Sequence, residues 1–204
     1  GENDMFIIKK SDINSDNYDA LVYVRRSLKK VKIPSFIKFI SSCAFTYSKI
    51  ESIFIPSQIL EICDSAFCTC EMLKVVDFQE NSQLRLIDKY AFSQTSIKKI
   101  FIPQKVGKID NYAFSFTDSI KFVDFSSNSM VQEIGSHCFD SSCLRSFSVP
   151  SNVKEIDQTF LRNVKLEIIE FDENNSWELV CEVTSEFNEN TIILVPVQVS
   201  QYCL

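Results

Sequence analysis

Hydrophobic residues recur along this chain in one pattern. An apolar residue is followed by a second apolar residue three places later and by a third five places later. The first residues of successive motifs lie 22 to 24 residues apart. In an extended strand the last two apolar positions face the same side, because side chains alternate. A unit this short cannot bury that side alone, so the pattern predicts a stack of similar coils. The seven motifs are Leu28-Val31-Ile33, Ile50-Ile53-Ile55, Leu73-Val76-Phe78, Ile97-Ile100-Ile102, Ile120-Val123-Phe125, Leu144-Phe147-Val149 and Leu166-Ile169-Phe171.

A second set of apolar residues lies between the motifs and consists of an isoleucine followed by a small residue and a phenylalanine. We expect the motifs to form one wall of the stack, and the phenylalanines to form a column in the core towards the opposite wall. The six anchors are Ile40 with Ala44-Phe45, Ile62 with Ala66-Phe67, Ile87 with Ala91-Phe92, Ile109 with Ala113-Phe114, Ile134 with Cys138-Phe139 and Ile156 with Thr159-Phe160.

The residues after each motif are of two kinds. Pro34, Pro56, Pro103 and Pro150 each follow a strand directly and end it, because proline has no N–H for a strand ladder. Elsewhere a polar insertion follows, such as residues 79–83 or 126–129. The two kinds alternate from Ile53 on, which indicates a larger unit of two repeats. We expect one parallel sheet of about seven strands, ~4.8 Å apart and roughly 30 Å across.

Units such as SIFIPSQILEICDSAFCTCEML and KIFIPQKVGKIDNYAFSFTDSI resemble the BspA-like branch of the leucine-rich repeat family. Ile-Pro after the strand and Ala-Phe in the return segment carry the resemblance, which covers about residues 28–173. It implies a leucine-rich-repeat solenoid, an α/β-horseshoe-like right-handed superhelix. The parallel sheet would form the concave face, with loops and short helical turns on the other side. Cys138 and Thr159 depart from the pattern, and the usual glycine before the return segment occurs only as Gly135.

The two ends of the repeat region need protection, because an open end would expose strand edges and core. We therefore expect residues 1–27 to form an N-terminal cap, with residues 20–24 as its ordered part. Residues 28–173 would hold the repeats. Residues 174–204 would form a degenerate last repeat and C-terminal cap, within one structural domain overall.

The strand positions between the apolar ones face solvent and form two columns. They place apolar side chains on a surface expected to be polar, which is typical of an interaction site. The alternative is ordinary packing between neighbouring strands. The candidate binding residues are Phe54, Val75, Asp77, Lys99, Phe101, Phe122, Asp124 and Ile168.

A third column lies where the strands begin and contains four successive basic residues. This column indicates either an edge that attracts acidic partners such as sulfated glycans, or a solvated rim. Stacked basic side chains repel one another, and Asp77 and Asp124 are nearby candidates to offset that positive charge. The column is Lys29, Glu51, Lys74, Lys98, Lys121, Arg145 and Glu167.

The composition of the chain argues against several classes of function. A net charge of −6 argues against nucleic-acid binding, and three glycines leave little room for phosphate-binding loops. No apolar run approaches the roughly 20 residues that span a bilayer. His137 is the one histidine and shares a variable repeat position with Cys43. The motifs therefore indicate no catalytic residue, no metal site and no cofactor, and the eight cysteines read mostly as small core residues.

The resemblance implies a surface or secreted adhesion protein that binds host or matrix proteins such as fibronectin and fibrinogen. An intracellular protein–protein interaction scaffold is the alternative, because no signal peptide is visible and a cytoplasmic location stays open. Both are non-catalytic protein-binding roles. We expect a monomer or a weak end-to-end dimer.

Overall fold

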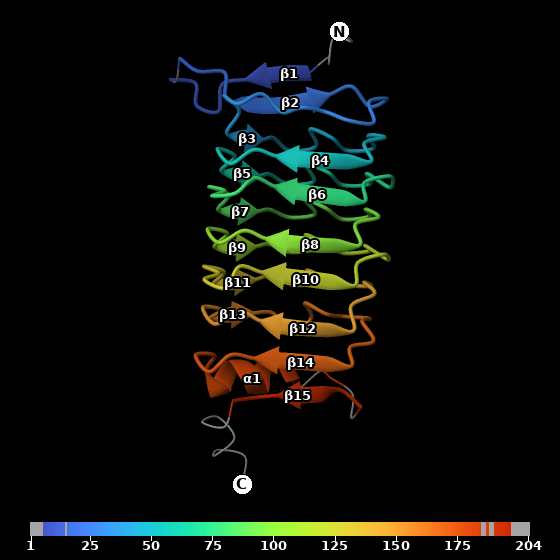
Figure 1. The fold of residues 1–204 in the computed structure, drawn as a ribbon, viewed down its shortest axis with the longest axis vertical. Coiled ribbons are helices and arrows are strands. Elements are labelled where there is room, and N and C mark those ends of the chain that lie inside the picture. The colour runs from blue at the N-terminus through green and yellow to red at the C-terminus, as the bar shows by residue number, and fades with distance from the viewer. Residues whose placement is uncertain (1–5, 15, 185–186, 188–189, 197–204) are drawn as a thin grey trace.

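The chain forms a column of stacked coils with two strand-bearing walls (Figure 1). The structure is a computed structural model that describes residues 6–14, 16–184, 187 and 190–196, without the side chains of residues 177, 181, 182 and 184. Each coil runs through a longer strand on one wall, the front wall, and a two-residue strand on the other, the rear wall. The expected solenoid of parallel strands is therefore confirmed.

The front wall is built from the motifs predicted in the sequence. The first motif forms no full strand, and only Lys32 bridges to Phe54. At the far end, β15 (Ile192–Leu194) pairs in parallel with β14 and extends the wall by one strand. The six motif strands are β4 (Ser52–Ile55), β6 (Val75–Phe78), β8 (Lys99–Ile102), β10 (Phe122–Phe125), β12 (Ser146–Val149) and β14 (Ile168–Phe171).

The front wall is not one continuous sheet, which corrects the expectation from the sequence. Strand β4 pairs with β6, β8 with β10, and β12 with β14. The N–H of Gln79, after β6, donates to the Ile55 carbonyl at 3.0 Å, and that of Ser126 donates to Ile102 at 3.2 Å. The equivalent residues after β8 and β12 are Pro103 and Pro150, which have no N–H to donate. Strands β8 and β12 thus form a ladder only with the next strand of the chain, which produces the double repeat.

The rear wall carries a second parallel sheet where the resemblance implies short helical turns. Within the described residues of the repeat region the return segments form tight turns and no helix. The anchor isoleucines lie in these short strands and are buried in the core. The short strands pair with one another in a hydrogen-bonded ladder separate from the front wall. The rear strands are β3 (Phe39–Ile40), β5 (Glu61–Ile62), β7 (Leu86–Ile87), β9 (Lys108–Ile109), β11 (Glu133–Ile134) and β13 (Glu155–Ile156).

The return segments are held to their neighbours by alternate backbone N–H groups. The N–H groups of Cys43, Phe45 and Tyr47 donate to carbonyls of the next coil at 2.8–3.2 Å. Cys43 and Tyr47 have φ of 58° and 60°, and later coils repeat the arrangement with non-glycine residues. Left-handed backbone costs such residues roughly 1–2 kcal/mol each. Bonds between coils, at roughly 0.5–1.5 kcal/mol each, offset that cost.

The core contains the predicted column of phenylalanines. Phe45, Phe67, Phe92 and Phe114 are fully buried and stacked, with centroids of successive rings 4.6, 5.0 and 5.4 Å apart. Phe139 continues the stack at 5.3 Å from Phe114. Offset aromatic stacking at this spacing adds to the burial of each ring. The periodic sequence thus produces one continuous core along the column.

The ends of the column differ from the repeats. At one end β1 (Phe6–Lys9) pairs antiparallel with β2 (Ala20–Val24), which joins the rear sheet through β3. At the other end the single described helix, α1 (Trp177–Thr184), contacts β13 of the rear wall (Figure 1). The boundaries at residues 27 and 173 remain a prediction. None of the described helices is long and apolar enough to cross a membrane.

Candidate binding face

The predicted columns of outward side chains exist on the front wall. Ser52 pairs with Val75 and Phe54 with Asp77 across β4 and β6. The same register joins Lys99 to Phe122 and Phe101 to Asp124 across β8 and β10. The sequence spacing alone therefore located these side chains correctly on the wall.

Four apolar side chains on this wall alternate between the two columns. Phe54 is 52% exposed, Val75 44%, Phe101 48% and Phe122 55%. None of the three rings stacks on another aromatic ring among the described residues. Ile168 is half-buried and lies beyond β12, whose outward residues are serines, so it is apart from the other four. We call Phe54, Val75, Phe101 and Phe122 the apolar zigzag.

The charged residues of the face are exposed and weakly paired. The Lys99 Nζ lies 2.5 Å from Oδ2 of Asp124, and the two side chains are 60% and 48% exposed. A pair this exposed contributes at most about 1 kcal/mol. Asp77 forms no ion pair within the described part of the chain. Neither aspartate pairs with the third column, so the expected offset of its charge does not occur through ion pairs.

The third column, which we call the basic rim, is ion-paired only at its ends. Lys29 contacts Glu51 at 3.0 Å, and Arg145 contacts Glu167. The hydrogen bond that Glu51 accepts from Lys29, together with the positive charges of Lys29 and Lys74, lowers the pKa of Glu51. Lys74, Lys98 and Lys121, in the middle, form no ion pair among the described residues, and all three are exposed.

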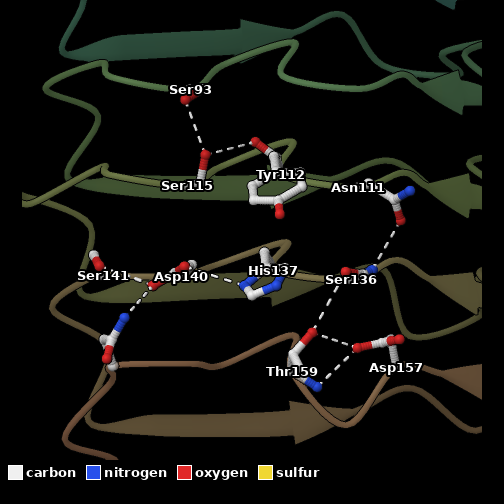
Figure 2. A network of polar contacts seen from close by, with 11 residues as sticks. Ser93, Asn111, Tyr112, Ser115, Ser136, His137, Asp140, Ser141, Asp157 and Thr159 are labelled. Carbon is white, nitrogen blue, oxygen red and sulfur yellow. Dashed lines mark hydrogen bonds and ion pairs between the residues drawn. The ribbon is translucent and has the colours of Figure 1, made fainter.

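His137 takes part in a polar network on the return segments (Figure 2). Its Nδ1 lies 3.1 Å from Oδ2 of Asp140, a buried carboxylate that also accepts hydrogen bonds from Ser141 Oγ and Asn163 Nδ2. The ring of His137 stacks on Tyr112 at 4.7 Å. Tyr112 in turn stacks on Tyr90 at 4.9 Å. The network and the ring stack join four coils, and among the described residues no nucleophile contacts the histidine.

That aromatic stack was missed in the sequence, where the position was read as variable. The signal was present: Cys43, Ser65, Tyr90, Tyr112 and His137 occupy the same repeat position. Each has a positive φ, which turns its side chain outwards along the edge of the column. Aromatic residues at successive copies of an edge position stack because neighbouring coils lie about one strand spacing apart.

Only two of the six cysteines that the structure describes are buried, so most of these do not act as the small core residues expected from the sequence. Cys138 is fully buried in an alanine position, and Cys70 is fully buried with its Sγ bonded to the Phe45 carbonyl. Burial raises the pKa of both thiols. Burial, with Glu61 and Asp88 nearby, raises the pKa of Cys63 to about 11. These three and Cys43, Cys68 and Cys143 are free thiols, whereas the side chains of Cys181 and Cys203 lie outside the described residues.

The family can now be assigned. A model of the BspA-type leucine-rich repeat region matches residues 22–121 and 110–177, in six copies. The chain belongs to the BspA-type leucine-rich repeat family. Proteins of this family are typically non-catalytic, and the repeats form a protein-interaction module. No curated protein sequence matches the chain significantly.

Solved structures share the fold of this BspA-type chain. The pneumococcal vaccine antigen PcpA superposes with a TM-score of 0.67 at 21% identity, covering 86% of this chain and 50% of PcpA. A leucine-rich cell surface protein from Faecalibacterium prausnitzii gives 0.54 at 20%, covering 84% and 53%. A leucine-rich repeat protein from T. pallidum gives 0.56 at 19%, covering 82% and 68%. The BspA-type chain thus spans about half the length of the first two.

Proposed function

We propose that this chain is the protein-binding part of a surface or secreted adhesion protein, and that its front wall engages host or matrix proteins. The observation that carries the proposal is the apolar zigzag. Three phenylalanine rings and a valine are each about half exposed on strands that the fold holds in register. The names of PcpA as an antigen and of the Faecalibacterium protein as a cell surface protein support the location.

Covering the apolar zigzag would contribute enough free energy to support binding of a partner. Covering the exposed half of a phenylalanine ring removes on the order of 100 Å² from water. At about 25 cal/mol per Å² this contributes roughly 2.5 kcal/mol for each ring. Because the rings stand on hydrogen-bonded strands, little backbone order has to be gained on binding. The Lys99–Asp124 pair and Asp77, which forms no ion pair among the described residues, would form the polar rim of such an interface.

A matched pair of variants tests the face. In the first, Phe54, Phe101 and Phe122 are each replaced by serine. In the control, Phe36, Tyr47 and Phe116 are replaced by serine; these rings lie elsewhere and are 53%, 71% and 49% exposed. Binding to immobilised fibronectin and fibrinogen, measured by surface plasmon resonance, should fall at least about tenfold for the first variant and less than about twofold for the control. Equal losses in both variants would refute the assignment of the face.

Location needs its own experiment. Intact source cells are treated with protease, and the released peptides are identified by mass spectrometry. Peptides of this chain released without lysis are the expected result. Peptides that appear only after lysis would overturn the adhesion proposal.

An intracellular interaction scaffold is the second candidate. Cys43 and Cys143 are exposed free thiols, which are uncommon in proteins of oxidising compartments. Thiol counting on protein isolated from the source cells without reductant separates the two candidates. Eight free thiols favour the scaffold, and oxidised or capped Cys43 and Cys143 favour the surface protein.

A further inference from the structure

The front wall carries a charge opposite to that of the whole chain. From the first motif to β10, the two outward columns and the basic rim comprise fifteen positions. They hold seven lysines and three carboxylates, a local net charge of +4, whereas the chain has −6. The seven lysines are Lys29, Lys30, Lys32, Lys74, Lys98, Lys99 and Lys121.

Most of these lysines are available to a partner. Of the seven, only Lys29 and Lys99 form ion pairs among the described residues, with Glu51 and Asp124. Lys30, Lys32, Lys74, Lys98 and Lys121 are exposed. Stacked like charges about 4.8 Å apart repel one another, and an acidic partner would relieve that repulsion.

The positive charge stops where the apolar zigzag stops. On β12 and β14 the outward residues are Ser146, Ser148, Ile168 and Glu170, and Glu170 accepts a hydrogen bond from Ser148 at 3.0 Å. On the rim beside them, Arg145 is neutralised by Glu167. Free basic groups and the apolar zigzag therefore occupy the same part of the wall, from the first motif to β10. Two independent properties thus define one surface.

We infer that the partner bound by this surface is an acidic protein segment with interspersed apolar side chains. The inference rests on the proposed function and adds the chemistry of the ligand. Apolar side chains of the segment would cover the zigzag, while its carboxylates would lie against Lys74, Lys98 and Lys121. Asp77 and Asp124 argue against a sulfated polysaccharide, because a polymer charged at every step would meet both carboxylates. A protein segment can place uncharged or basic residues opposite them.

Defined polymers serve as probes of this chemistry. A random copolymer of glutamate and tyrosine supplies both carboxylates and apolar rings, poly-glutamate supplies charge alone, and heparin supplies sulfate. Fluorescence anisotropy with the whole chain should show the copolymer binding more tightly than either of the other two. The affinity should weaken as salt rises from about 50 to 500 mM, because exposed charges are screened. Absence of copolymer binding up to roughly 1 mM would overturn the inference.

Charge variants separate this inference from the proposed function. Replacing Lys74, Lys98 and Lys121 by glutamine should weaken copolymer binding at least about tenfold and flatten its salt dependence. A control with Lys38, Lys89 and Lys154 of the rear side replaced by glutamine has the same net charge and should change affinity less than about twofold.

The outcomes distinguish the two ideas. If the phenylalanine-to-serine variant loses copolymer binding while the rim variant keeps it, the acidic-partner inference fails and the binding face stands. If heparin binds most tightly and depends on the rim lysines, the partner is a sulfated polymer and the inference is wrong. If neither variant differs from its control, both ideas fail.

Discussion

Gly135 lies directly against Asn111 of the preceding coil. The Asn111 Oδ1 accepts a hydrogen bond from the N–H of Ser136 at 2.9 Å (Figure 2). A Cβ at Gly135 would lie 2.5 Å from that oxygen and 2.6 Å from the Asn111 backbone nitrogen. Glycine is needed here for space, since the φ of Gly135 is not positive.

The close contact predicts that Gly135→Ala destabilises the protein. A contact with backbone atoms cannot be relieved by a side-chain rotation, so the coil must shift, at a cost of about 1–3 kcal/mol. Gly107→Ala is the control, because its Cβ would meet nothing nearer than the Arg85 carbonyl at 3.8 Å. Urea unfolding should show a loss for the first variant and a change within about 0.5 kcal/mol for the second. Equal midpoints would contradict the proposed crowding.

Removal of one ring from the phenylalanine column should be costly. Phe92 is fully buried between Phe67 and Phe114, so Phe92→Ala leaves a cavity that its neighbours cannot fill. We expect a loss of about 3–5 kcal/mol in the free energy of unfolding, measured with urea. Phe122→Ala, on the exposed face, should cost less than about 1 kcal/mol. Similar losses in the two variants would show that the column is not the main source of stability.

Asp140 holds neighbouring coils together through its carboxylate. Replacing the buried Asp140 by alanine removes the acceptor for the half-buried Ser141 and His137 and for the exposed Asn163. Unfolding should become easier by about 1–3 kcal/mol. Ser141→Ala removes only one of these donors and should cost clearly less. A neutral effect of Asp140→Ala, by thermal unfolding, would mean that water replaces the carboxylate.

Alkylation should distinguish the cysteines by exposure and pKa. At pH 8, iodoacetamide should modify Cys43 and Cys143 first, because both are exposed. Cys63, whose pKa is raised from 9.0 to about 11, should react slowly and accelerate as the pH approaches 11. Since the folded pKa is raised, the contribution of Cys63 to stability is intact below pH 9 and is lost as the pH rises from 9 through 11. Peptide mapping measures each site, and rapid modification of buried Cys138 at pH 8 would indicate local opening.

Much of the candidate face could be found from the sequence. The places of Phe54, Val75, Phe101 and Phe122 follow from the two-residue alternation of a strand, and the register between coils follows from the repeat itself. The isolation of Ile168 follows as well, because the outward residues of the preceding motif are Ser146 and Ser148. The ion pair between Lys99 and Asp124 did not follow, because it depends on which side chains of different strands meet, and spacing along the chain does not contain that information.

By itself, the sequence determined the stacked coils, the phenylalanine core and the outward columns, because each coil packs only on copies of itself and periodicity then dictates the contacts. The tertiary structure alone decided how those coils are joined. It showed that Pro103 and Pro150 divide the front wall into separate ladders and that the return segments form a second sheet. It also showed the left-handed residues and the stack of Tyr112 on His137. These features arise from hydrogen bonds and ring contacts between coils, which exist only when the column is assembled.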